Sequence, residues 1–286
     1  MTSEAIQLAV GDLTFDAVAD GPAGGEPILL LHGFPEAAHS WRLVQPLLAA
    51  AGMRSVAPDL RGYSPGARPA APTDYAIEVL VGDVLGLADA LGWDTFHLLG
   101  HDWGGALAWH TAGRFPGRVR TLSVASTPHP AAFNAAKRSG PSADGDDQAA
   151  RSGYMATFRD PGAAELFFAD DRALLKLLYA GSGLDDRSAA FYLDRFSTLD
   201  AIQGPLNWYR GADPSDATGL GPITMPTLYV WSTDDIALGR TAAELTTGQV
   251  DGPYTFVELE GVSHWIPEQA GDELAAAVIA HVGAGG

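Results

Sequence analysis

The chain has 286 residues, of which 47% are hydrophobic, 35 are acidic and 17 are basic, so its formal net charge is −18. This acidity argues against binding to nucleic acid or to anionic membrane surfaces. The chain has no cysteine, which excludes disulfides and thiol chemistry, and it shows neither a signal peptide nor an apolar run of membrane-spanning length. We therefore expect a soluble, cytoplasmic globular protein, and the sequence leaves its oligomeric state open.

The first half of the chain alternates between strand and helix patterns. Residues 5–10 and 13–19 surround Gly11-Asp12 and predict an opening hairpin. The elements expected next are a strand at 28–31, a helix after Ser40, a strand at 54–57, a helix at 75–91, a strand at 96–99, a helix at 103–114 and a strand at 119–125. This alternation predicts an α/β fold whose mostly parallel sheet carries helices on both faces.

Strand patterns stop after Pro130 and resume only at 227–231 and 255–259. The intervening region is helical in pattern, so we expect residues 1–129 and 217–286 to form the core and residues 130–216 an inserted helical cap. Segment 139–147 is polar and rich in helix breakers, which predicts a mobile loop. Such a loop could gate a pocket or could be a tolerated surface insertion, and the sequence leaves both readings open.

The pentapeptide Gly-His-Asp-Trp-Gly at 100–104 has the form of a nucleophile elbow, with aspartate where serine usually stands. An elbow turns sharply from a strand into a helix, and glycines are needed because larger side chains would collide with the sheet. A carboxylate can displace a leaving group from saturated carbon and form a covalent ester. The pattern therefore predicts that Asp102 is a nucleophile.

Two partners follow Asp102 in the order nucleophile, acid, histidine. Asp235 comes after the strand expected at 227–231, and His264 comes after the strand expected at 255–259. Asp234 is the alternative acid. His264 would activate the water that hydrolyses the ester, and the acid would hold its tautomer. The backbone N–H groups of Trp103 and Phe34 are the expected oxyanion-hole donors.

Several motifs together carry a resemblance that covers nearly the whole chain. They are His-Gly-Phe-Pro-Glu at 32–36, Pro-Asp-Leu-Arg-Gly-Tyr-Ser at 58–64, Gly-His-Asp-Trp-Gly-Gly at 100–105 and Ser-His-Trp around His264. With them the chain resembles the α/β-hydrolase-fold epoxide hydrolases and their haloalkane dehalogenase relatives. The resemblance implies the α/β-hydrolase fold with a helical cap. No cofactor is implied, and no spacing of residues indicates a metal site.

The two groups differ in how the leaving group is handled. An opening epoxide gives a strongly basic alkoxide that needs a proton donor, and tyrosine can supply one. The resemblance to epoxide hydrolases implies two such tyrosines on the cap, here Tyr154 and Tyr209. Tyr179 and Tyr192 compete for the role, although helix packing already explains the periodicity around them.

The expected function is conversion of an apolar or aromatic epoxide to a vicinal diol. The residues expected to line the substrate pocket are His129, Phe158, Trp208 and Trp265. A haloalkane dehalogenase and a non-catalytic ligand-binding relative are the alternatives. Phe34 weighs against the dehalogenase, because many of these enzymes place Asn or Glu there and a phenyl ring replaces neither. The identity of the epoxide, the regiochemistry, the enantioselectivity and the biological role stay open.

Overall fold

The computed structural model describes residues 3–143, 145–180 and 182–285. Eight strands form one sheet in the order β1-β2-β4-β3-β5-β6-β7-β8. They are β1 (Glu4–Val10), β2 (Leu13–Asp20), β3 (Glu26–Leu31), β4 (Met53–Pro58), β5 (Phe96–His101), β6 (Val119–Ala125), β7 (Thr227–Asp234) and β8 (Tyr254–Ser263). The β1–β2 and β2–β4 pairs are antiparallel and the other pairs are parallel, so the predicted sheet is confirmed.

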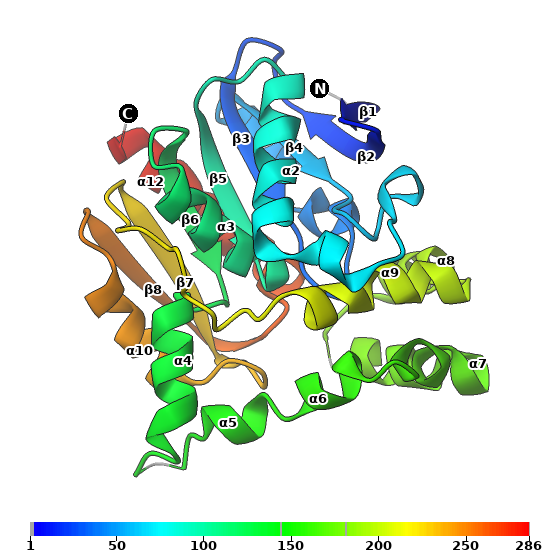
Figure 1. Ribbon diagram of the computed structural model, residues 1–286. Helices are drawn as coiled ribbons and strands as arrows, with labels where there is room; N and C mark the ends of the chain where they lie inside the picture. The colour runs from blue at the N-terminus through cyan, green and yellow to red at the C-terminus, as the bar shows by residue number, and fades with distance from the viewer. Residues whose placement is uncertain (1–2, 144, 181, 286) are drawn as a thin grey trace.

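Helices cover both faces of the sheet, and each face has its own apolar core (Figure 1). The core helices are α1 (Gln45–Ala50), α2 (Ile77–Ala90), α3 (Trp103–Arg114), α10 (Arg240–Leu245), α11 (Ile266–Gln269) and α12 (Gly271–Gly285). Four 3₁₀ turns join them, namely η1 (Ala38–Arg42), η2 (Pro65–Ala67), η3 (Pro72–Tyr75) and η4 (Thr246–Gln249). Helices α2 and α3 lie in front of the sheet in Figure 1, and α12 lies behind it. No helix in the described ranges combines the length and apolarity needed to cross a membrane.

All the helices between β6 and β7 lie along the lower side of the molecule in Figure 1, and we call them the cap. They are α4 (Pro130–Ser139), α5 (Gln148–Arg151), α6 (Tyr154–Arg159), α7 (Ala163–Ala180), α8 (Asp186–Arg195) and α9 (Leu199–Gly211). Helix α7 is interrupted at 169–172 by non-helical residues. The domain boundaries expected from the sequence stay a prediction.

One local expectation changes, and the mobility expected for segment 139–147 stays a prediction. The helix expected at 75–91 begins only at Ile77, because η3 precedes it and Ala76 is extended, with φ −60° and ψ 147°. The hydroxyl of Tyr75 donates to the carbonyl of Pro69 at 2.8 Å and holds that turn in place. Segment 139–147 includes Asp144, which lies outside the described residues. Near the C-terminal end of the segment, Asp146 is hydrogen-bonded to two other parts of the chain. The Asp146 carboxylate accepts from Arg151 Nε at 2.8 Å and from the Thr241 N–H at 2.9 Å.

The cap is attached to the core by specific contacts. The indole N–H of Trp208 on α9 donates to the carbonyl of Arg61 at 2.7 Å, and the hydroxyl of Tyr179 on α7 donates to the carbonyl of Pro35 at 2.7 Å. Gly204 on α9 packs so closely on Gly62 that a Cβ on either residue would collide with the other backbone. Helices α7 and α9 are thereby positioned over the carboxyl edge of the parallel strands, where sites of α/β proteins form.

Candidate active site

Asp102 occupies the tip of the turn between β5 and α3. Its backbone has φ 51° and ψ −121°, which is unusual for a residue other than glycine. The turn is possible because neighbouring glycines leave room. A Cβ on Gly104 would collide with the Leu31 carbonyl, and one on Gly33 would collide with the Asp102 side chain. The aspartate is therefore held in a strained conformation by a closely packed frame, as is common at functional sites.

The two carboxylate oxygens of Asp102 have different surroundings. Oδ1 accepts a hydrogen bond from the backbone N–H of Phe34 at 2.8 Å, and Oδ2 lies 3.3 Å from His264 Nε2. The carbonyl oxygen of Asp102 accepts from the hydroxyl of Thr127 at 2.7 Å. The Phe34 donor is thus placed as the sequence predicts. Oδ1 is thus held by the backbone, and Oδ2 faces the His264 ring.

The structure places Asp235, and not Asp234, beside His264. Asp235 Oδ2 lies 2.9 Å from His264 Nδ1, and Oδ1 accepts from the N–H groups of Ala237 and Leu238 at 2.8 and 2.9 Å. Asp234 is exposed at the end of β7. Asp235 is buried, so these hydrogen bonds satisfy a charge that would otherwise be costly to remove from water.

His264 lies between two carboxylates, and this sets its charge. Burial alone would lower the pKa of His264, but Asp235 and Asp102 raise it well above the usual value. Burial alone would raise the pKa of Asp102, but the hydrogen bond and charge of His264 hold it below the usual value. These shifts favour an imidazolium at His264 between two ionised carboxylates, Asp102 and Asp235.

A second pair of buried groups, His101 and Glu36, lies next to His264. His101 Nε2 donates to the carbonyl of His264 at 2.8 Å, and its Nδ1 lies 3.0 Å from Glu36 Oε2. Glu36 also accepts from the N–H of Gly33 at 2.9 Å. His32 links this loop to the loop after β4, because its Nδ1 lies 2.8 Å from the Gly33 carbonyl and its Nε2 accepts from the Leu60 N–H at 3.1 Å. Both histidines, His32 and His101, thus bind backbone groups of neighbouring loops.

Tyr154 at the start of α6 and Tyr209 on α9 lie together above Asp102. Their ring centroids are 6.4 Å apart, and the Tyr209 ring lies edge-on to Trp103 at 5.0 Å. Burial raises the pKa of both hydroxyls, and the negative charge of Asp102 raises them further. Both tyrosines are therefore protonated hydrogen-bond donors.

The competing tyrosines lie elsewhere and have structural partners. Tyr179 donates to the Pro35 carbonyl, and Tyr192 donates to Glu268 Oε1 at 2.6 Å. Their rings stack on each other at a centroid distance of 5.6 Å. They hold α7 and α8 on the core instead of facing Asp102.

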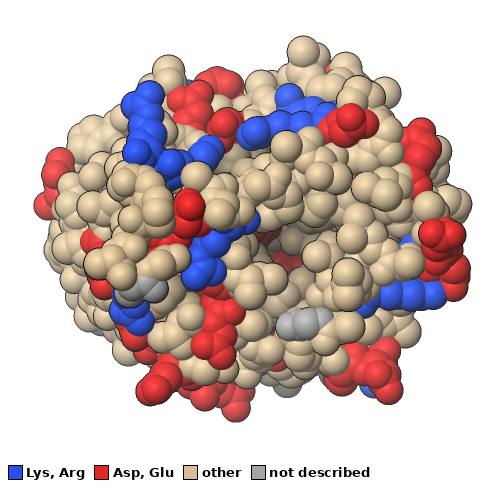
Figure 2. All heavy atoms as spheres, turned by 90° about the horizontal axis from the view of Figure 1, so that it is seen from below, with Lys and Arg blue, Asp and Glu red and all other residues tan. Residues whose placement is uncertain are grey.

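The cavity beside Asp102 is small and mostly apolar, with a volume of about 20 Å³. Its lining residues are Asp102, Trp103, Thr127, Phe133, Tyr154, Met155, Pro214 and Leu238. A space of this size holds about one water molecule. The face of the molecule seen from below is hollowed near its centre, and largely uncharged atoms surround the hollow (Figure 2).

The four residues predicted to line the substrate pocket lie in different surroundings. Phe158 belongs to the aromatic cluster around the site, with its ring 5.0 Å from Tyr154 and 5.5 Å from Phe34. Trp208 lies behind Trp103, and Trp265 packs edge-on against Tyr179. None of the four is among the residues that line the cavity beside Asp102, and His129 has a structural role instead. Its Nδ1 accepts from the Ala131 N–H at 3.2 Å and caps α4, and burial lowers its pKa to about 4.

Some residues of the site are missing from the sequence prediction. Ser126 and Thr127 follow β6 directly and contact the Asp235–His264 pair and Asp102, respectively. Their position is a signal that could have identified them, since sites of parallel sheets collect residues at the carboxyl ends of several strands. Met155 and Leu238 had no such signal, because apolar residues with ordinary spacing are common in any core.

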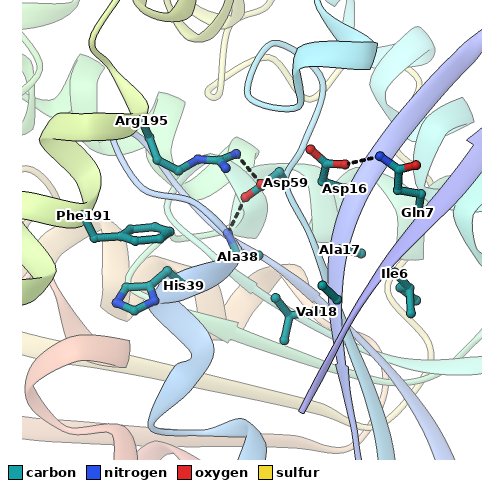
Figure 3. Close-up of a pocket in the computed structure, with 11 residues that line it drawn as sticks. Ile6, Gln7, Asp16, Ala17, Val18, Ala38, His39, Asp59, Phe191 and Arg195 are labelled. Atoms are coloured by element: carbon teal, nitrogen blue, oxygen red, sulfur yellow. Dashed lines mark hydrogen bonds and ion pairs between the residues drawn. The ribbon is translucent and has the colours of Figure 1, made fainter.

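A larger groove, of about 550 Å³, lies away from Asp102 between the β1–β2 hairpin, η1 and α8 (Figure 3). Its polar groups are paired with one another, including Arg195 with Asp59 and Gln7 with Asp16. His39 stacks there on Phe191. The described residues contain no cluster of three or more His, Asp or Glu side chains arranged to hold a metal ion.

Comparisons with known proteins agree on one relationship. The alpha/beta hydrolase fold model matches residues 26–270. Epoxide hydrolase 4 of Mus musculus is 32% identical over 277 residues, covering 93% of this chain and 76% of that protein. Epoxide hydrolase A of Mycobacterium tuberculosis is 30% identical over 300 residues, covering 92% of each. A solved structure described among novel epoxide hydrolases in metagenomes from hot environments has a TM-score of 0.85 and 32% identity, covering 99% of both chains.

Proposed function

The chain belongs to the α/β-hydrolase fold family, in its epoxide hydrolase group, and from this we propose that it converts an apolar or aromatic epoxide to a vicinal diol through an ester at Asp102. The observation that carries the mechanism is the asymmetry of the Asp102 carboxylate. Oδ1 is held by the Phe34 N–H, and Oδ2 faces His264. A carboxylate held in this way presents one oxygen to a carbon electrophile.

In the first step, Asp102 Oδ2 bonds to an epoxide carbon and the ring C–O bond breaks. The alkoxide that forms takes a proton from the tyrosine pair, and the resulting tyrosinate is reprotonated at the expense of the His264 imidazolium. Tyr154 and Tyr209 are suited to this role, because both are protonated, Tyr154 lines the cavity with Asp102, and the Tyr209 ring packs on Trp103, which lines the same cavity. After this step the ester is neutral and His264 is a neutral base.

In the second step, water adds to the ester carbonyl carbon and gives its proton to His264 Nε2. Negative charge builds on the former Oδ1, where the N–H of Phe34 is placed to stabilise it, together with that of Trp103. The C–O bond to the product then breaks, and the leaving alkoxide takes the proton of the hydroxyl added by water, which leaves the Asp102 carboxylate beside the imidazolium formed in the water attack. Asp235 stabilises that imidazolium through Nδ1. The protons balance without any other group.

The substrate class is inferred from the lining of the site. The groups around the Asp102 cavity are mainly aromatic and aliphatic, among them Phe133, Met155 and Leu238. A cavity of about 20 Å³ is far smaller than the few hundred Å³ that usual substrates occupy, so the cap has to shift to admit the epoxide. The cytoplasmic location expected from the sequence stays a prediction.

The direct test is turnover of a panel of alkyl, styrene-type and polycyclic aromatic epoxides, with haloalkanes tested beside them. We expect diol from at least one apolar or aromatic epoxide and no halide release. Halide release without diol would instead assign the chain to the dehalogenases. Binding of an epoxide without turnover would favour the non-catalytic alternative.

Replacing the two cap tyrosines tests the proton-donor role. Tyr154→Phe and Tyr209→Phe should each lower kcat/KM about 10- to 100-fold, and the double variant at least about 10³-fold, as expected when general acids are removed. Tyr192→Phe is the matched control, because it also removes a cap hydroxyl, one that binds Glu268 away from Asp102. The idea is wrong if the double variant retains activity similar to that of Tyr192→Phe.

The two steps should respond differently to pH. Asp102 stays ionised well into the acid range, because its pKa is lowered, so alkylation persists there. Ester hydrolysis needs neutral His264, whose raised pKa falls once the Asp102 charge is lost to the ester. As the pH falls from about 7 to about 5, we therefore expect slower hydrolysis and accumulation of the ester. Rapid quenching with mass spectrometry measures the ester, and a parallel decline of both steps would contradict this assignment.

A further inference from the structure

A serine that the steps above do not use touches both members of the acid–base pair. Ser126 follows β6 directly, and its hydroxyl donates to Asp235 Oδ2 at 2.6 Å. The same Oγ lies 2.9 Å from His264 Nδ1, which is also 2.9 Å from Asp235 Oδ2. With the ring proton on Nδ1, this N–H is shared between Oδ2 and Oγ. Ser126 thus accepts from the base while it donates to the acid.

The backbone of Ser126 is held in a conformation that favours glycine. Its φ is +72°, which costs an L-residue energy that glycine would not pay. Contacts with β7 hold it there, because its N–H donates to Val230 at 2.8 Å and its carbonyl accepts from the Tyr229 hydroxyl at 2.8 Å. Compared with glycine, Ser126 adds only Cβ and the hydroxyl. The strained residue carries a side chain that is hydrogen-bonded to both Asp235 and His264. Strain of this kind is common at functional sites, so the side chain is expected to have a function.

We propose that Ser126 is a positioning residue, whose hydroxyl fixes the mutual orientation of Asp235 and His264 and tunes how readily His264 gives up its proton in each cycle. This rests on the proposed function, since it assigns to His264 the activation of water. Ser126 touches neither the cavity beside Asp102 nor Asp102 itself among the contacts of the described residues. Its effect should therefore reach the reaction only through the acid and the base.

The direction of the effect follows from the charges around His264. Asp102 and Asp235 raise the proton affinity of the imidazole, and His101 lies beside the ring at a centroid distance of 5.0 Å. The guanidinium of Arg151 binds the Asp235 carbonyl at 2.8 Å. By donating a hydrogen bond to Oδ2, Ser126 reduces the negative charge that faces Nδ1. This effect should outweigh the hydrogen bond that Oγ accepts from Nδ1–H, because the charge of Asp235 is the largest influence that raises the pKa of His264. Without this hydrogen bond, Asp235 should hold the imidazolium more strongly, and His264 should become a free base only at higher pH.

The kinetic test compares Ser126→Ala with Ser126→Gly, which both lose the hydroxyl while glycine also relieves the backbone strain. In single-turnover experiments, we expect ester hydrolysis to slow about 10- to 100-fold in both, as for loss of a hydrogen bond to a charged group, with alkylation unchanged within about twofold. The pH at which hydrolysis is half-maximal should rise. Ser126→Asn tolerates the positive φ and can donate from its amide, so it should recover part of the rate.

Two comparisons separate positioning from a general effect on folding. Ser55→Ala removes another buried serine hydroxyl, which contacts Gln45 far from Asp102, and should leave both steps unchanged. Ser126→Gly should be at least as stable as the parent while it hydrolyses the ester slowly. Hydrolysis at the parent rate in both Ser126 variants, or slow hydrolysis only in unstable ones, would overturn the proposal.

A measurement without turnover tests the effect of Ser126 on His264 separately from the proposed function. The ¹⁵N resonances of the His264 side chain report its Nδ1–H hydrogen bond and, on titration, its pKa. We expect Ser126→Ala to shift the Nδ1 resonances and raise the pKa of His264. If the parent protein converts no epoxide, the proposed function fails, and this titration still decides the role of Ser126. Identical resonances and titration curves in parent and variant would refute it.

Discussion

Asp102→Ala is expected to lower kcat/KM for the epoxide substrate by about 10⁴-fold or more, a size typical for the loss of a catalytic nucleophile. The reason is the covalent step, since Asp102 is the only carboxylate among the described residues that line the cavity with Tyr154. The loss should fall on ester formation, so no protein-bound adduct should be detectable by mass spectrometry. Epoxide turnover by a folded Asp102→Ala variant at more than a small fraction of the parent rate would refute the covalent mechanism.

Asp102→Gly is the matched variant for separating chemistry from strain. Both substitutions remove the carboxylate, but only glycine adopts φ 51° and ψ −121° easily. We expect equal loss of activity, with the glycine variant more stable than the alanine variant by about 1 kcal/mol in the free energy of unfolding. Both variants should also show a lower pKa of His264, because Asp102 is one of the two charges that raise it.

Isotope labelling of the parent enzyme gives the same step a positive test. If water attacks the ester carbonyl carbon, the oxygen that enters the diol comes from Asp102 Oδ2, and the water oxygen remains in the carboxylate. A single turnover in ¹⁸O-water should therefore label the peptide that contains Asp102 and leave the diol unlabelled. Label in the diol after one turnover would mean that water attacks the epoxide directly.

The parts of the site that were predicted from the sequence are those that depend on residues close together in the chain. The elbow at Asp102 depends on glycines within a few residues, and Asp235 and His264 follow strands that can be recognised from their apolar runs. The structure brings these three side chains together, as expected. Strand ends were less accurate, since β8 continues to Ser263 through the exposed Glu260 and Gly261, which interrupt the apolar pattern.

The parts of the site that were not predicted from the sequence depend on packing between segments far apart in the chain. His129 has the residue type and position of a pocket histidine, but the first turn of α4 takes its ring nitrogen as a cap. Trp208 has an indole N–H that binds the Arg61 carbonyl, so its ring lies behind Trp103. Ser126 required knowledge that the end of β6 lies beside the loops after β7 and β8. Each of these depends on which hydrogen-bond partner a neighbouring segment offers.

His264→Gln should separate the two steps of the reaction. Asp102 remains ionised and keeps its Phe34 donor, so alkylation should still occur. Hydrolysis should slow by about 10³-fold or more, because glutamine cannot take the proton from water. The Asp235 carboxylate keeps three hydrogen bonds, from Ser126, Ala237 and Leu238, so its burial should not prevent folding.

The expected product of His264→Gln is a stable ester, visible as one added substrate mass per chain on the peptide that contains Asp102. The tyrosinate formed on ring opening can no longer be reprotonated by His264 and must take its proton from solvent, so alkylation itself should slow moderately. This gives the sharpest test of the proton balance. A folded variant that forms no adduct would show that His264 is required already for ring opening, whereas repeated turnover would show that another group activates the water.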